Sequence, residues 1–166
     1  MRYAQIRSLD ISNGTGVGVA LFTQGCHFHC SGCFNANTWD FKGGIEWTKE
    51  THESFMKLVD RPYIQRVTIL GGEPLEECNY DALIDLLREI KSKHSDKIIW
   101  LYTGFTWEDA LKSEKRKEIL QYADVVVEGQ YKEALKDPNL HFRGSSNQRI
   151  INSQESLKKG KVVAYV

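Results

Sequence analysis

Short apolar runs rich in β-branched residues alternate along the chain with amphipathic runs. The apolar runs are residues 17–23, 66–70, 97–102 and 124–127, and their length and composition predict buried strands. Residues 48–58 and 80–94 carry apolar positions at helical spacing, which in the second run are Leu83, Ile84, Leu86, Leu87 and Ile90. Two shorter helices are predicted between the last two strands, the second over residues 113–120.

Polar residues mark where these helices begin. Ser, Thr and Asn side chains can accept a hydrogen bond from the first turn, and the expected N-caps are Thr48, Asn79, Thr106 (paired with Asp109) and Ser113.

Gly14-Thr15-Gly16-Val17-Gly18 precedes a strand instead of following one, so it is interpreted as a flexible entry loop and not as a nucleotide-binding motif. Short strands are also expected at residues 148–151 and 161–165.

Strand–helix alternation predicts an α/β fold with a mostly parallel sheet and right-handed crossovers. A complete eight-stranded barrel takes about 250 residues, and this chain has 166. We therefore expect a single domain over residues 1–166, built as a partial barrel or an open sheet. Residues 150–166 form a C-terminal extension to which no role is assigned. In either architecture, loops after the carboxyl ends of the strands form the site.

Composition excludes several classes of protein. Lys and Arg together number 22, as do Asp and Glu, so the formal net charge is zero and a nucleic-acid partner is not expected. The sequence contains neither an apolar run of membrane-spanning length nor a signal-peptide pattern, which predicts a cytoplasmic protein without a membrane partner. In that reducing compartment the four cysteines are expected to be metal ligands or catalytic groups.

Three of those cysteines, Cys26, Cys30 and Cys33, are spaced C-x₃-C-x₂-C directly after a predicted strand. A cubane iron–sulfur cluster takes one thiolate per iron, so three thiolates leave one iron open to an exchangeable ligand. Zinc held by three cysteines and His27 or His29 is an alternative, as is a redox dithiol. A ferredoxin would need Cys78 as its fourth ligand, and that residue lies 45 positions downstream of Cys33.

A second motif, Gly71-Gly72-Glu73-Pro74, follows the strand over residues 66–70. Paired glycines let the backbone approach a ligand closely, and strand-end carbonyls beside a carboxylate suit an ammonium group. A tight turn is the alternative interpretation. Glu128, at the end of the strand over 124–127, is placed to bind ribose hydroxyls, with a solvated surface acid as the alternative.

The sequence resembles the activating proteins of anaerobic ribonucleoside-triphosphate reductases, within the radical S-adenosylmethionine superfamily. The resemblance covers residues 3 to 148 and rests on blocks at 10–14, 21–26, 33–35, 38–39, 71–74, 102–104, 136–138 and 143–148. The last block, Arg-Gly-Ser-Ser-Asn-Gln, makes the assignment specific to that family. Such a relationship implies a partial, open (β/α) barrel of the radical S-adenosylmethionine type.

The resemblance also implies the chemistry. Cys26, Cys30 and Cys33 would ligate a [4Fe–4S] cluster whose fourth iron binds S-adenosylmethionine, and Gly71, Gly72 and Glu73 would receive the methionine ammonium. Reductive cleavage would give a 5′-deoxyadenosyl radical that removes a hydrogen from a glycine of the reductase. Gly32 and Phe34 would cover the adenine, and a low-potential protein such as flavodoxin would supply the electron.

Two other functions remain open from the sequence. An activase of another glycyl-radical enzyme, for instance a formate-lyase-like one, is the first alternative. A non-enzymatic zinc-binding interaction module is the other. Arg143, Asn147 and Gln148 are expected either to bind the reductase or to close over the cofactor. An incomplete barrel would leave a lateral opening through which a peptide loop of the partner enters.

Overall fold

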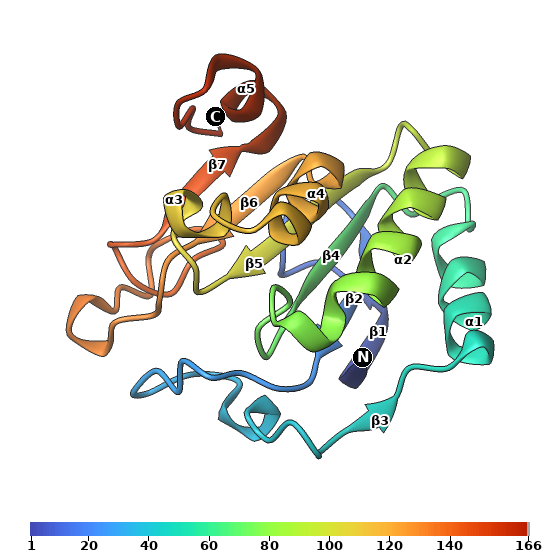
Figure 1. The fold of residues 1–166 in the computed structure, drawn as a ribbon, viewed down its shortest axis with the longest axis horizontal. Coiled ribbons are helices and arrows are strands. Elements are labelled where there is room, and N and C mark those ends of the chain that lie inside the picture. Colours follow the sequence, from blue (N-terminus) through green and yellow to red (C-terminus); the bar gives the residue numbers. More distant parts are fainter. Residues whose placement is uncertain (166) are drawn as a thin grey trace.

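A computed structural model describes residues 1–165 and shows a seven-stranded sheet in the order β3-β1-β2-β4-β5-β6-β7 (Figure 1). The strands are β1 (Arg2–Asp10), β2 (Gly18–Thr23), β3 (Ile45–Glu46), β4 (Arg66–Gly71), β5 (Ile98–Thr103), β6 (Val125–Glu128) and β7 (Arg149–Asn152). Strands β2, β4, β5 and β6 run parallel, while β1 and β7 pair antiparallel with β2 and β6. β3 and β7 form the two edges, so the sheet is open.

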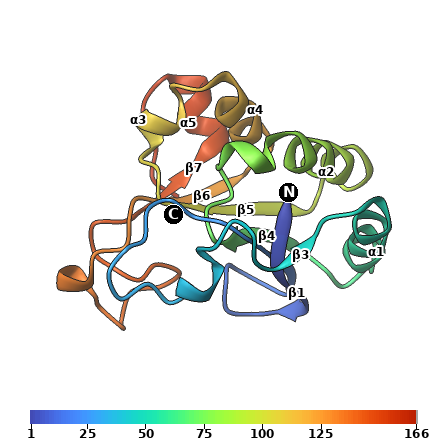
Figure 2. The same cartoon turned by 60° about the horizontal axis from the view of Figure 1, so that its bottom comes forward.

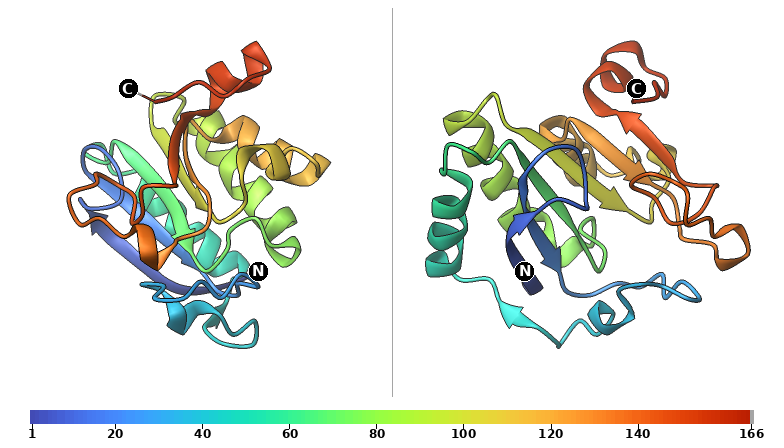
Figure 3. Two further views of the ribbon diagram at one scale, coloured as in Figure 1. Left: turned by 90° about the vertical axis from the view of Figure 1, so that its left-hand side faces the viewer. Right: turned by 180° about the vertical axis from the view of Figure 1, so that it is seen from behind.

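The helices cover one face of this sheet. They are α1 (Lys49–Val59), α2 (Tyr80–Lys93), α3 (Trp107–Ala110), α4 (Glu114–Tyr122) and α5 (Ser153–Lys159), with 3₁₀ turns η1 (Ala36–Thr38), η2 (Glu77–Asn79) and η3 (Glu133–Leu135). Figure 3 shows α1, α2 and α4 on the same side of the sheet. We call the opposite side the open face. Within residues 1–165, no helix is both long enough and apolar enough to span a bilayer.

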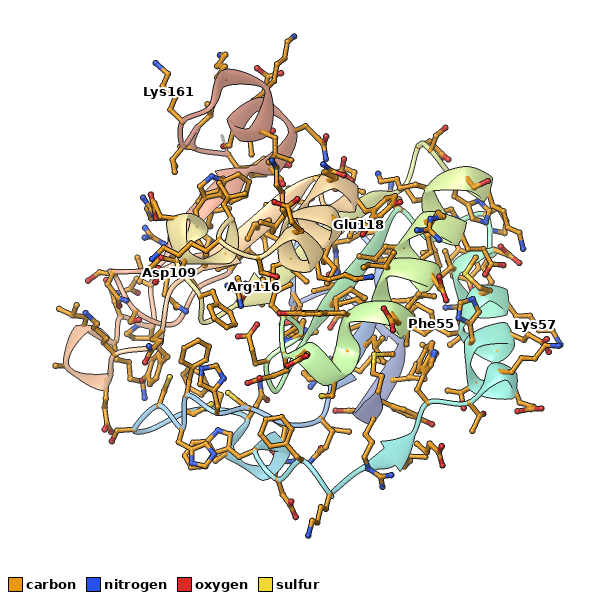
Figure 4. All side chains as sticks on the ribbon, viewed as in Figure 1. Phe55, Lys57, Asp109, Arg116, Glu118 and Lys161 are labelled. Atoms are coloured by element: carbon orange, nitrogen blue, oxygen red, sulfur yellow. The ribbon has the colours of Figure 1, made fainter. Side chains whose placement is uncertain are left out.

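Alternation along the strands explains this arrangement. In β2, Val19 and Leu21 belong to the core beneath the helices, whereas Ala20 and Phe22 lie in a separate apolar cluster on the open face. Successive strand residues point to opposite faces, so a strand that is apolar throughout is buried on both. On α1, Phe55 points inward and Lys57 points to solvent (Figure 4). The sequence therefore specifies strands that are apolar on both faces, although helices cover only one of these faces.

Most predicted elements are confirmed to within one or two residues. Thr48, Thr106 and Ser113 each accept a hydrogen bond from the first turn of their helices, as expected. Asn79 precedes α2, but the prediction of a capping side chain is wrong. Its amide instead donates to the carbonyls of Glu73 and Pro74, at 3.1 and 3.3 Å, and so fastens the Gly-Gly-Glu-Pro turn to the helix.

Three features at the chain ends differ from expectation. β1 was not predicted, because its residues are mostly half-buried and lack a clear alternation. The expected strand at residues 161–165 is an isolated bridge between Ile151 and Ala164. The C-terminal extension is part of the fold: β7 pairs with β6, Ile151 is fully buried, and α5 follows it.

The loop over residues 10–18 is held by a buried arginine, which corrects its interpretation as flexible. Arg66 is fully buried and forms a 2.9 Å ion pair with Asp10, and it also donates to the carbonyl of Thr15 at 3.0 Å. Burial alone would raise the pKa of Asp10, but hydrogen bonds from Arg66 and Asn13 bring it below its ordinary value. Gly14, with φ +142°, gives the guanidinium the space that a side chain would fill.

Candidate functional site

The two motifs singled out in the sequence meet at one edge of the sheet. The cysteine loop (residues 26–33) follows β2, and the turn beginning at Gly72 follows β4, which is the parallel neighbour of β2. Backbone hydrogen bonds join them: the Gly72 N–H donates to Thr23 O and the Glu73 N–H donates to Gly25 O, each at 2.8 Å. Parallel pairing places both carboxyl ends together, so the two motifs lie side by side.

The three cysteines of the loop are free thiols with different surroundings. Cys26 is buried at the end of β2, whereas Cys30 and Cys33 are partly exposed. Cys33 N–H donates to Cys30 O at 3.1 Å, which closes a tight turn through Gly32, where φ is +74°. Burial raises the pKa of the Cys26 thiol to about 11, although the backbone N–H groups of Phe28 and His29 lower it in part.

The histidines of the loop are engaged elsewhere. The His27 ring hydrogen-bonds the Glu76 carboxylate, and the His29 ring stacks on Trp39 with centroids 4.5 Å apart. Across residues 1–165, no three His, Cys, Asp or Glu side chains are grouped to hold a metal ion. Both histidine rings thus have partners other than the three cysteines.

An iron–sulfur cubane requires a different arrangement of the three cysteines than a single metal ion does. It takes one thiolate per iron and spreads its ligands over separate corners, so the sulfurs need not converge on one point. The donor set is three free thiols on one loop, a chemistry that fits a cluster with three protein ligands. Cys78 is exposed, in η2, and its thiol hydrogen-bonds Asn79 Oδ1 at 3.7 Å.

Glycines bring the backbone of β4 against the cysteine loop. A Cβ added to Gly72 would lie 2.5 Å from the carbonyl oxygen of Gly25, the residue before Cys26. At Gly71, φ is +111° and a Cβ would lie 2.6 Å from the backbone nitrogen of Thr23. Both positions therefore require glycine. The two glycines allow the backbone at the end of β4 to lie directly against the backbone at the end of β2.

Glu73, the residue after these glycines, is buried, with 1 % of its surface exposed. Its carboxylate accepts hydrogen bonds from Leu75 N–H at 2.8 Å, Thr103 Oγ1 at 2.7 Å and Gly104 N–H at 2.7 Å. Burial raises the pKa of Glu73 to about 7, against the lowering effect of these donors. A carboxylate has about four lone-pair positions, so one acceptor position remains for a further donor.

Glu128 is 2 % exposed, so the interpretation as a solvated surface acid is wrong. Its oxygens accept from Trp107 N–H and from Arg149 Nε, each at 2.6 Å. These bonds raise the pKa of Arg149 and join β6 to β7 and α3. Glu128 also lines a cavity of about 620 Å³ beside Phe28. Its bonded oxygens favour a structural role, and ribose binding by Glu128 stays a prediction.

A second cavity of about 550 Å³ lies on the open face, and Cys33 is part of its wall. Phe22, Leu70 and Tyr102 line it from the sheet, and Phe34 lines it from the end of the cysteine loop. Phe34 is 68 % exposed, and its ring lies 5.2 Å from that of Tyr131. The cavity thus joins the cysteine loop to the side of the sheet that the helices leave uncovered.

A long loop, residues 129–148, packs against the cysteine loop, and we call it the cover segment (Figure 2). The side chain of Gln148 connects the two ends of the cover segment. It accepts a hydrogen bond from Gly144 N–H and donates one to Gly129 O, each at 2.9 Å. Arg143 donates to Gln148 O at 2.5 Å. These polar residues therefore order the cover segment itself, and Arg143 and Gln148 also line the open-face cavity.

Sequence reasoning missed the residues that join the cover segment to the cysteine loop. Ser31 Oγ donates to the Glu133 carboxylate at 3.1 Å, and Cys30 Sγ lies 3.9 Å from Gln130 Oε1. Gly32 has φ +74°, a backbone conformation that residues with a side chain rarely adopt, which explains glycine there. The partners are about 100 positions apart, and no local pattern indicates such a contact.

Comparison with known proteins agrees with this geometry. Residues 12–151 match the model of a family described as a 4Fe-4S single cluster domain, so the fold and site define an iron–sulfur protein. Curated relatives named anaerobic ribonucleoside-triphosphate reductase-activating protein include one from Enterobacteria phage T4, 36 % identical over 96 % of this chain and 99 % of the relative. Those from Vibrio cholerae and Escherichia coli K12 are 34 % and 33 % identical over 90 % of this chain and 97 % of their own length. The chain belongs to this family of reductase-activating proteins.

Proposed function

We propose that this protein activates an anaerobic ribonucleoside-triphosphate reductase by generating a glycyl radical on it. The observation that carries the proposal is the juxtaposition of three free thiols after β2 with the Gly-Gly-Glu turn after β4, in a chain of this family. When bound, a [4Fe–4S] cluster supplies the electron that cleaves S-adenosylmethionine to methionine and a 5′-deoxyadenosyl radical. The remaining steps belong to the protein's own residues.

Cys26, Cys30 and Cys33 would hold the cluster. Burial raises the pKa of Cys30 as well as that of Cys26, and the neighbouring Cys33 raises the pKa of Cys30 further. Thiolates are the ligands, so assembly of the cluster must remove the protons of the Cys26 and Cys30 thiols, whose pKa values are raised. Once the ligands are formed, three cysteines leave one iron to a small-molecule ligand.

The Gly71–Glu73 turn would bind the methionine ammonium of S-adenosylmethionine. Gly71 and Gly72 keep side chains away from the backbone beside Gly25, and Glu73 retains one acceptor position after its three hydrogen bonds. An ammonium placed there would favour the ionised carboxylate and lower the pKa of Glu73 from about 7. Phe34 and Gly32 would cover the adenine.

The open-face cavity would receive the glycine of the reductase. Its inner wall is apolar, with Phe22, Leu70 and Phe142, and it reaches Cys33. A carbon radical reacts with nearby C–H bonds, so the site must exclude other donors and water while admitting one backbone segment. The unclosed sheet offers the side entrance that such a segment needs. A low-potential protein such as flavodoxin would donate the electron.

The test is anaerobic mixing of the cluster-loaded protein with the reductase, S-adenosylmethionine and a reductant. We expect a glycyl radical signal by electron paramagnetic resonance. Cys26→Ala should abolish both the cluster and the signal, whereas the matched variant Cys78→Ala should retain both, because Cys78 lies outside the loop.

The same assay separates the alternatives. A glycyl radical signal on a formate-lyase-like enzyme, with none on the reductase, would show that the partner is the former enzyme and not the reductase. Full iron content in Cys26→Ala would refute the assignment of the ligands. A colourless protein carrying one zinc per chain would refute the proposed function altogether.

A further inference from the structure

Cys30 differs from the other two cysteines because its sulfur contacts a distant part of the chain. The backbone N–H groups beside Cys26 belong to Phe28 and His29, and Cys33 Sγ accepts from Asn35 N–H at 3.4 Å. Those donors all belong to the cysteine loop or its immediate continuation. Cys30 Sγ instead lies 3.9 Å from the side-chain amide of Gln130, at the start of the cover segment.

The contact between Cys30 and Gln130 follows directly after β6, whose end is held by a bond from Gly129 N–H to Phe105 O at 3.3 Å.

The direction of the Gln130 bond must reverse when Cys30 becomes a ligand. A free thiol can donate to the amide oxygen, but a thiolate only accepts. The amide oxygen and nitrogen of glutamine have nearly the same shape, and a half-turn about the last torsion exchanges them. Gln130 Nε2 can therefore donate to the Cys30 thiolate from the same position of the chain.

Gln130 is held in place by the cover segment. Asn147 Nδ2 donates to Gln130 O at 2.8 Å, and Asn147 Oδ1 accepts from the buried Ser145 at 2.6 Å. The backbone of Gln130 is thus fixed between β6 and the Ser-Ser-Asn-Gln block. This arrangement gives Asn147 a definite task, which is to position the residue that contacts Cys30.

We propose that Gln130 is a positioning residue that donates a hydrogen bond to the Cys30 sulfur and raises the reduction potential of the cluster. The inference rests on the proposed function, because it requires the cluster. Reduction adds negative charge to the cluster and its thiolates, so a donor stabilises the reduced form more than the oxidised form. Hydrogen bonds to the sulfurs are among the features that set the potentials of such clusters.

The test is a redox titration of the cluster-loaded full-length protein without S-adenosylmethionine, followed by the electron paramagnetic resonance of the reduced cluster. Gln130→Leu removes the donor with little change in bulk. The ratio of reduced to oxidised cluster at a fixed potential should fall by up to about tenfold, equivalent to about 59 mV for one electron. Asn147→Ala should shift the potential in the same direction by less.

Gln121→Leu is the matched control, because Gln121 is exposed on α4 and should leave the potential unchanged. If Gln130→Leu does not load four irons, Gln130→Glu keeps the shape but lacks the donor, and its potential should fall further because of the added charge. An unchanged potential in a fully loaded Gln130→Leu or Gln130→Glu protein would overturn the inference and leave the proposed function intact. A wild-type protein that binds no cluster would instead sink the proposed function.

Discussion

At the scale of single residues, the site is built from groups whose surroundings differ although their sequence positions are adjacent. Cys26 is buried against the end of β2, Cys33 faces the open-face cavity, and Cys30 faces the cover segment. Glu73 is the only carboxylate of the Gly-Gly-Glu-Pro turn, and it lies fully inside the protein with three donors around it.

The buried Glu73 makes the stability of the cluster-free protein depend on pH. Its folded-state pKa of about 7 exceeds the ordinary value of 4.5, so its stabilising contribution is fully present below pH 4.5 and is lost as the pH rises through 7. A difference of this size corresponds to about 3 kcal/mol. The free energy of unfolding of wild type, minus that of Glu73→Gln, should therefore fall by about this amount between pH 4.5 and pH 8.

Urea denaturation of the cluster-free protein across this pH range measures the difference. Glu77→Gln serves as the control, because Glu77 is exposed in the neighbouring turn and its removal should preserve the wild-type profile. A Glu73→Gln protein whose stability stays parallel to that of wild type from pH 4.5 to pH 8 would show that burial does not hold the proton on Glu73.

The sequence indicates candidate chemistry-bearing residues, but it does not indicate the partners that contact them. The spacing of Cys26, Cys30 and Cys33 and the order Gly-Gly-Glu are local patterns with a direct chemical meaning, so they can be found without a structure. Glu128 was assigned to ribose or to solvent because its partner Arg149 is 21 positions away. Which group satisfies a carboxylate depends on how the strands pair, and single-residue reasoning does not contain that information.

At the scale of elements, the contact between the ends of β2 and β4 holds the two motifs together. The register pairs Thr23 with Gly71, so β2 and β4 end side by side and the loops that follow them begin next to each other. Arg66, at the start of β4, fixes the loop that leads into β2 through its ion pair with Asp10. The two strands are thus connected at both ends, which makes their relative position rigid.

Gly72→Ala tests this contact. The added Cβ would lie 2.5 Å from Gly25 O, and because the obstacle is backbone, the strand ends must move apart. We expect a loss of about 1–3 kcal/mol in the free energy of unfolding and a reduced iron content after anaerobic reconstitution, measured by urea denaturation and by iron analysis.

Gly160→Ala provides the comparison, because a Cβ there meets nothing within 4 Å, although φ is +67°. Its cost should be limited to about 1 kcal/mol of backbone strain, with full iron content. A Gly72→Ala protein that loads four irons and unfolds like wild type would contradict the claim that the close approach requires glycine.

Elements with a strong internal pattern were predicted well, and those defined by their neighbours were not. β2, β4, β5 and β6 are short apolar runs, and α1 and α2 have an apolar stripe, so length and periodicity identify them. β1 is a strand because β2 provides an edge for it, and its own burial pattern shows no clean alternation. α5 spans only seven residues, which is too short for periodicity to indicate a helix.

At the scale of the whole molecule, the cysteine loop lies between the open sheet and the cover segment. Helices close one face of the sheet, and the cover segment packs against the cysteine loop (Figures 1 and 2). The open-face cavity lies on the other face, where Cys33 is part of its wall. The α/β class and the absence of closure follow from the order of elements and the chain length. The packing of residues 129–148 onto the cysteine loop does not, because that segment carries little regular structure.

This architecture is compatible with the proposed action on another protein. A closed barrel would surround the proposed radical chemistry, whereas the unclosed sheet leaves the side beside Cys33 open to a segment of the proposed partner. The Arg-Gly-Ser-Ser-Asn-Gln block orders part of the wall of the open-face cavity. Under the proposed function, the reductase would be recognised at the cover segment and this cavity, next to the proposed cluster.

The most direct test of the central claim is iron and sulfide analysis of anaerobically prepared protein, combined with electron paramagnetic resonance of its reduced cluster with and without S-adenosylmethionine. The account predicts about four irons and four sulfides per chain, and a spectrum that changes when S-adenosylmethionine is added, because the one iron without a cysteine ligand binds it. A cluster-loaded protein whose spectrum is the same with and without S-adenosylmethionine, or a preparation that contains zinc in place of iron, would contradict it.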